Sequence, residues 1–89
     1  MKKGTTESGF NYQIEESNLD NMELIDMLAE VDSGNVSALP KATTMLLGKE
    51  QKEALYNHLR TDKGNVPVEA FTRELFEIIQ SVGETGKKS

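Results

Sequence analysis

Two loops of the form Asp-x-Gly-Asn-Val, at 32–36 and 62–66, are the first places where side chains could do chemistry. Asp and Asn oxygens suit Ca²⁺, and an EF-hand loop needs oxygen ligands at its third and fifth positions and a Glu at its twelfth. In the two loops these positions hold Gly34, Val36 and Thr43, and Gly64, Val66 and Arg73. Both loops are therefore interpreted as turns, which Asp and Asn favour through local hydrogen bonds.

His58 is the only histidine of the chain, and there is no cysteine. A zinc site needs three or four ligands, and disulfides or thiolate sites need cysteine. The residues one helical turn before His58 are Ala54 and Leu55, which supply neither a ligand nor a second base. The sequence therefore predicts no catalytic residues, no metal site and no cofactor.

The chain has 89 residues, of which 36% are hydrophobic and 28% charged. That length makes one domain with a small core, which favours completion of the core by a partner or by self-association. No apolar run approaches the roughly 20 residues of a membrane helix. Met1-Lys2-Lys3 is followed by a polar segment, unlike a signal peptide. We expect no membrane partner and a cytoplasmic location.

Charge is distributed unevenly along the chain, whose net charge is −5. Residues 1–35 hold eight acids against Lys2 and Lys3, whereas residues 36–89 hold eight bases and seven acids. A nucleic-acid binder needs a basic face that neutralises phosphates. The sequence therefore predicts no nucleic-acid partner.

Residues 1–9 are polar and are expected to be disordered. Phe10, Tyr12 and Ile14 then alternate with polar residues, which is typical of a short strand. We expect at most this single strand, followed by helices. The predicted fold is mostly α: one compact four-helix domain over residues 10–83, with residues 84–89 as a flexible tail.

Caps and apolar stripes predict helices near 20–32, 37–47, 49–60 and 67–82. Asp20, three residues before Glu23, suits a capping box, and Ser37 suits the second cap. Gly48 separates the second and third helices. The fourth helix is expected to be the most buried, on the face formed by Val68, Phe71, Leu75, Ile78, Ile79 and Val82.

Three apolar side chains fall outside the predicted core stripes: Phe76, Tyr56 and Met22. A large apolar residue off the core face is a candidate contact for another protein, although a neighbouring helix could equally cover it. The acids Glu23, Asp26 and Glu30 form a stripe that fits either a solvated face or a basic partner.

Four segments carry a resemblance to a known family: Ala38-Leu39-Pro40-Lys41, Leu46 to Lys52, Leu55-Tyr56-x-His58-Leu59-Arg60 and Gly64-x-Val66-Pro67. Together with the acidic stretch 22–32 they resemble small tail assembly chaperones of long-tailed phages and prophages of Gram-positive bacteria. The resemblance implies a non-enzymatic helical protein that binds the tape measure protein and recruits tail tube subunits in the host cytoplasm. It also implies absence from the mature virion.

Two other classes remain open. The short join at Gly48 is compatible with a helix-turn-helix transcriptional regulator, whose recognition helix would present Lys49, Gln51 and Lys52 to bases. Glu50 and Glu53 reduce the positive charge of that face. A small acidic inhibitor or antitoxin-like partner protein is the second alternative, and only a copurified partner would distinguish it.

Overall fold

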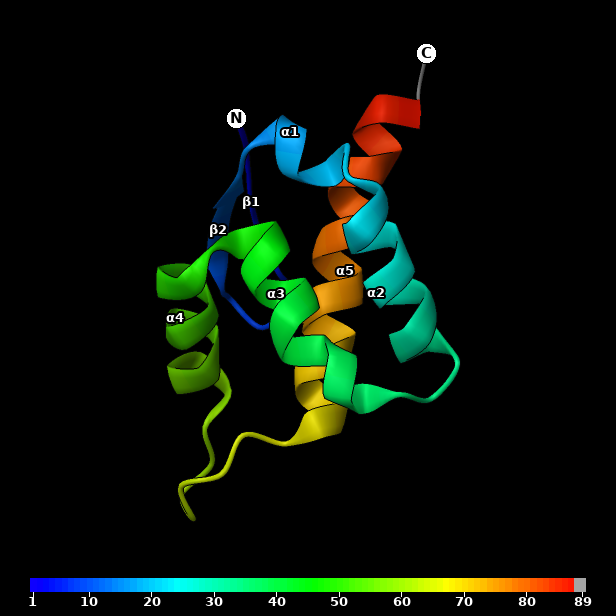
Figure 1. Cartoon of the computed structure of the whole chain (residues 1–89). Helices are drawn as coiled ribbons and strands as arrows, with labels where there is room; N and C mark the ends of the chain where they lie inside the picture. Colours follow the sequence, from blue (N-terminus) through cyan, green and yellow to red (C-terminus); the bar gives the residue numbers. More distant parts are fainter. Residues whose placement is uncertain (88–89) are drawn as a thin grey trace.

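The computed structural model describes the backbone of residues 1–87 and the side chains of residues 1–82. A two-stranded hairpin precedes the helices, and the longest helix comes last (Figure 1). The prediction of a mostly α fold is confirmed. In chain order the elements are β1 (Lys2–Thr5), β2 (Asn11–Ile14), α1 (Glu16–Leu19), α2 (Met22–Asp32), the 3₁₀ turn η1 (Val36–Ala38), α3 (Leu39–Leu47), α4 (Lys49–Leu59) and α5 (Val68–Lys87).

The prediction that residues 1–9 are disordered, with at most one strand after them, is wrong. β1 pairs with β2 in an antiparallel ladder that sets Gly4 opposite Tyr12. Gly9 turns the chain with a φ of 97°, and the Thr6 N–H donates to the Phe10 carbonyl at 2.9 Å. β1 was missed because its sequence, Lys-Lys-Gly-Thr, lacks the apolar alternation that marks a half-buried strand.

The four predicted helices are present as α2, α3, α4 and α5, and the structure adds the short α1, which was not predicted. Two expected caps are wrong. Asp20 ends the short α1, and the Asn21 side chain caps α2 by accepting the Glu23 N–H at 3.0 Å. Ser37 does not cap α3, because it lies inside η1. Gly48 separates α3 from α4, as predicted, and Pro40 occupies the first turn of α3.

The helix predicted near 67–82 is longer than expected, because the backbone of α5 continues to Lys87. Most of the expected tail 84–89 is therefore helical, and its residues 88–89 lie outside the described part of the chain. Val68, the first residue of α5, is 55% exposed. The prediction that it belongs to the buried face is therefore wrong.

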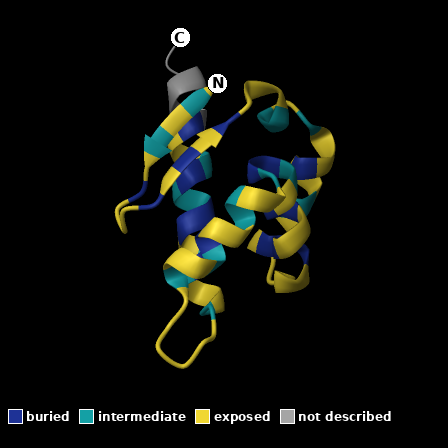
Figure 2. Cartoon of the chain, turned by 90° about the vertical axis from the view of Figure 1, so that its left-hand side faces the viewer, coloured by how far each residue is buried: buried dark blue, intermediate teal, exposed yellow. Residues whose placement is uncertain are grey.

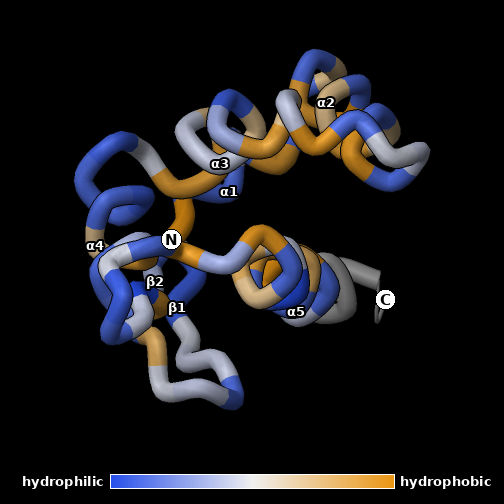
Figure 3. The backbone as a smooth tube through the Cα atoms, turned by 90° about the horizontal axis from the view of Figure 1, so that it is seen from below, coloured by the Kyte–Doolittle hydropathy of each residue, from blue (hydrophilic) through white to orange (hydrophobic). Residues whose placement is uncertain are grey.

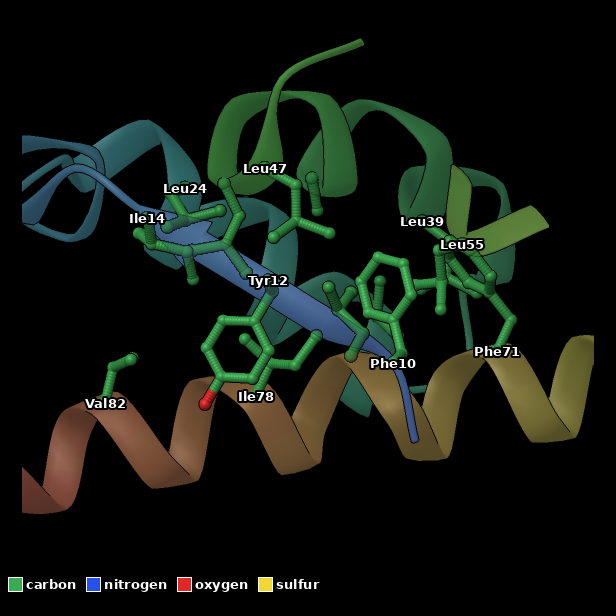
Figure 4. Close-up of a cluster of buried hydrophobic side chains, with 14 of the residues drawn as sticks. Phe10, Tyr12, Ile14, Leu24, Leu39, Leu47, Leu55, Phe71, Ile78 and Val82 are labelled. Atoms are coloured by element: carbon green, nitrogen blue, oxygen red, sulfur yellow. The ribbon is translucent and has the colours of Figure 1, made fainter. Parts of the chain in front are cut away.

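The core lies between α5 and the other elements (Figure 2). From below, α2, α3 and α4 form an arc beside α5, and the hairpin lies near α4 (Figure 3). Phe10, Tyr12 and Ile14 are buried on the inner side of the hairpin, where the Tyr12 ring lies over α5 beside Ile78 (Figure 4). The predicted alternation of this strand is therefore confirmed, with its apolar side inward. The buried hydrophobic residues of the other elements are Leu24, Val31, Ala38, Leu39, Ala42, Leu46, Leu47, Leu55, Phe71, Leu75, Ile78 and Val82.

Candidate partner-binding groove

An apolar groove of about 370 Å³ opens where η1 leads into α3, α4 ends and α5 begins. This region is the lower end of the molecule in Figure 1. Because three chain segments meet there only through their ends, their side chains line a hollow instead of filling it. The lining residues are Val36, Leu39, Pro40, Tyr56, Arg60, Val66, Val68 and Phe71.

The loop between α4 and α5 forms one side of this groove. Gly64 turns the chain with a φ of 95°, a conformation that favours glycine, and its N–H donates to the Thr61 carbonyl at 2.9 Å. The Thr61 N–H in turn donates to the Asn65 carbonyl at 2.8 Å. These bonds bring the chain back toward the groove, so that Val66 reaches its wall.

Arg60 is the one charged residue of the lining. Its Nη1 donates to the Gly64 carbonyl at 2.8 Å and its Nη2 donates to Asn57 Oδ1 at 3.2 Å. A guanidinium has five N–H donors, so these two bonds fix its position without using its full capacity. The groove therefore offers a cation held at an apolar surface.

Aromatic packing forms the inner wall, and two valines form the rim. The rings of Tyr56 and Phe71 lie 5.3 Å apart between centroids at an interplanar angle of 46°. Val36 and Val68 are 50% and 55% exposed. An apolar rim that faces water is stabilised when a partner covers it, because burial of apolar surface is favourable.

His58 serves the fold. Its Nε2 lies 3.0 Å from Ser8 Oγ and 3.2 Å from the Ser8 carbonyl, and its ring lies 5.6 Å from that of Phe10. These contacts attach the hairpin turn to α4, and both polar partners of the ring belong to one exposed residue. Among the described residues no group of three or more His, Cys, Asp or Glu side chains could hold a metal ion.

The three residues predicted as partner contacts lie in three different places. Tyr56 lines the groove. Phe76 is half-buried, packs against the core and lies beside Glu7 at a separate shallow hollow. Met22 is 70% exposed at the start of α2. Of the three predicted contacts, the groove therefore contains Tyr56 alone.

Val36, Val68 and Arg60 meet at the groove, although nothing in the sequence predicts that they are neighbours. All three lie at the ends of elements, where periodicity carries no information about spatial proximity. The available signal was the Gly64-x-Val66-Pro67 turn, which returns the chain sharply after α4.

The helix-turn-helix alternative places Gln51 on the base-reading face of α4. In the structure the Gln51 side chain is bound to the hairpin. Its Oε1 accepts the Gln13 N–H and its Nε2 donates to the Gln13 carbonyl, each at 2.8 Å. Reading a base with this amide would require breaking both bonds.

No protein-family model, curated protein or solved structure matches this chain. Among the described residues, none of the helices has the length and apolar character needed to cross a membrane.

Proposed function

We propose that this protein is a non-enzymatic phage tail assembly chaperone, which binds the tape measure protein, the tail tube protein or both in the host cytoplasm. It would leave the assembly before the virion matures. The observation that supports the proposal is that the segments with the family resemblance overlap with the lining of the groove. Segments that carry the family resemblance also supply five residues of the groove lining: Leu39, Pro40, Tyr56, Arg60 and Val66.

The groove supports a particular mode of binding. Short helices can hold an amphipathic helix whose apolar side chains fill a hydrophobic groove. The lining supplies the apolar surface. The Arg60 guanidinium supplies a positive charge that favours an acidic side chain on the partner helix. A tape measure protein, with its long apolar helices, offers partner segments of this kind.

Coexpression with the tape measure protein encoded by the same genome tests the proposal. We expect the chaperone to raise the soluble yield of that protein several-fold and to copurify with it. Val36→Glu should abolish the effect, because it places a charge on the apolar rim at an exposed position. Gln80→Glu is the matched control, since it adds the same charge at an exposed position of α5 outside the groove.

Equal yields with and without the chaperone would refute the proposal, as would equal activity of the Val36→Glu and control variants. Apolar contacts should tolerate moderate salt, whereas phosphate contacts weaken steeply with salt. Salt-sensitive DNA binding without any effect on a tail protein would therefore favour the transcriptional regulator instead.

A further inference from the structure

Helix α2 has a second apolar face, which points away from the core. Met22 and Ile25 are 70% and 48% exposed and lie one turn apart. At 100° per residue Ala29 falls between them on the same side, and it is exposed as well. Leu24 and Val31 are buried on the opposite side. The outer face of α2 is therefore an apolar strip that nothing in the described chain covers.

An acidic edge borders this strip. Glu23, Asp26 and Glu30 are exposed on α2 beside the apolar residues, and the helix contains no Lys or Arg. The groove has the complementary pattern, with apolar walls and Arg60 as its charged residue. Opposite charges at the edge of an apolar contact fix its orientation and suppress wrong partners.

The exposed hydrophobic side chains concentrate on these two surfaces. Apart from the first residue of the chain, the large ones divide into a pair on α2 and a pair on the groove rim. Isolated apolar residues on a surface are ordinary, whereas exposed apolar residues grouped into a patch mark interaction sites. The set among residues 1–82 is Met1, Met22, Ile25, Val36 and Val68.

We propose that the protein self-associates by docking the outer face of α2 from one copy into the groove of a second copy. Met22 and Ile25 enter the groove, and the acidic edge at Asp26 faces Arg60. The two surfaces lie on different parts of the molecule, α2 on one side and the groove at the lower end (Figure 1). Each docked copy therefore keeps one free surface, and the association forms rings or open chains.

This inference shares the groove with the proposed function, so a tail protein and a second copy would compete for it. Its test uses the purified chain alone and needs no tail protein. Failure of self-association would leave the tail-protein test untouched, and failure of that test would leave self-association untouched.

Sedimentation velocity over a range of concentrations is the experiment. We expect the mass of the unaltered chain to rise with concentration beyond twice the 9.9 kDa of one copy. Ile25→Glu removes the α2 face and keeps the groove, whereas Val68→Glu does the reverse. Each variant alone should stay monomeric. A 1:1 mixture should form dimers and nothing larger, because one intact groove meets one intact α2.

Gln80→Glu, which adds the same charge at an exposed site outside both surfaces, should associate like the unaltered chain. Ile25→Ser and Val68→Ser repeat the mixing test without added charge, and circular dichroism verifies that each variant folds. A charge exchange tests orientation: Arg60→Glu alone and Asp26→Lys alone should each weaken association, and the double variant that carries both changes should restore it.

Monomers of the unaltered chain at every concentration would overturn the proposal. So would a mixture of Ile25→Glu and Val68→Glu that stays monomeric. Association retained by either variant alone would mean that like surfaces pair with each other, and this result would also overturn it.

Discussion

The side-chain amide of Gln51 pairs with the backbone of Gln13 as the edge of a third strand would. Gln51 Nε2 donates to the Gln13 carbonyl at 2.8 Å, and the Gln13 N–H donates to Gln51 Oε1 at 2.8 Å. Nε2 also donates to the Leu47 carbonyl at 2.7 Å, which holds the amide in place. A two-stranded hairpin is marginal alone, and here α4 closes the outer edge of β2.

Replacing Gln51 should therefore loosen the hairpin. Gln51→Ala removes both bonds to Gln13 and should lower the free energy of unfolding by about 1–3 kcal/mol, at about 0.5–1.5 kcal/mol for each net hydrogen bond. Gln51→Glu should cost at least as much, because a carboxylate cannot donate to the Gln13 carbonyl. Urea denaturation gives the change in stability, and hydrogen exchange at the Gln13 amide locates it. Gln80→Ala, at an exposed site, is the control, and equal losses in both variants would contradict this role.

Replacing Leu75 and replacing Leu28, two leucines in helices that pack on the core, should destabilise the protein by different amounts. Leu75 is 0% exposed on α5, whereas Leu28 of α2 is half-buried at the edge of the core. Leu75→Ala should lower the free energy of unfolding by about 2–5 kcal/mol, and Leu28→Ala by less, because the site keeps contact with water. Thermal melts of the two variants measure the difference. Equal melting temperatures would show that the core is centred elsewhere.

The helices were predictable because each is specified within its own sequence. The stripe at Phe71, Leu75 and Ile78 and the break at Gly48 are local signals. The cap of α2 was misplaced by one residue because Asp20 and Asn21 are both good caps, and the short α1 decides between them.

The hairpin and the groove depend on contacts between distant residues. β1 is held by β2 and by bonds of its turn to α4 and α5, such as the Glu7 N–H donating to Glu77 Oε2 at 2.8 Å. The groove joins Val36 to Val68 across two helices. Neither relationship leaves a periodic pattern in the sequence, so neither could be derived from it.

Gly4 should tolerate no side chain while Tyr12 occupies its present position. A Cβ built on Gly4 would overlap the Tyr12 hydroxyl and ring, and that ring is 5% exposed, with its hydroxyl donating to Ser81 Oγ at 3.3 Å. Gly4→Ala should therefore lower the free energy of unfolding by about 1–3 kcal/mol, the usual range for overpacking. The double variant with Tyr12→Leu should show a smaller additional loss, measured as a double-mutant cycle in urea. Additive losses would place the Tyr12 ring elsewhere.

Glu74 is a buried carboxylate whose removal should stabilise the protein. It is 6% exposed on α5, and its Oε1 is buried without a hydrogen-bond partner among the residues whose side chains the structure describes. An unsatisfied buried polar group costs about 1–3 kcal/mol. Glu74→Leu should therefore raise the free energy of unfolding by about that amount. The melting temperature should rise by roughly 4–8 °C for each kcal/mol in a domain of this size.

Glu77 provides the matched control for this change on the same helix. Its carboxylate accepts the Glu7 N–H, so Glu77→Leu removes a partner that the hairpin turn uses and should lower the melting temperature. Both substitutions delete a carboxylate and add the same side chain. Opposite shifts would therefore distinguish a carboxylate with an unsatisfied buried oxygen, at Glu74, from one that accepts a hydrogen bond, at Glu77. A lower melting temperature for Glu74→Leu would mean that the Glu74 carboxylate contributes to stability where it lies.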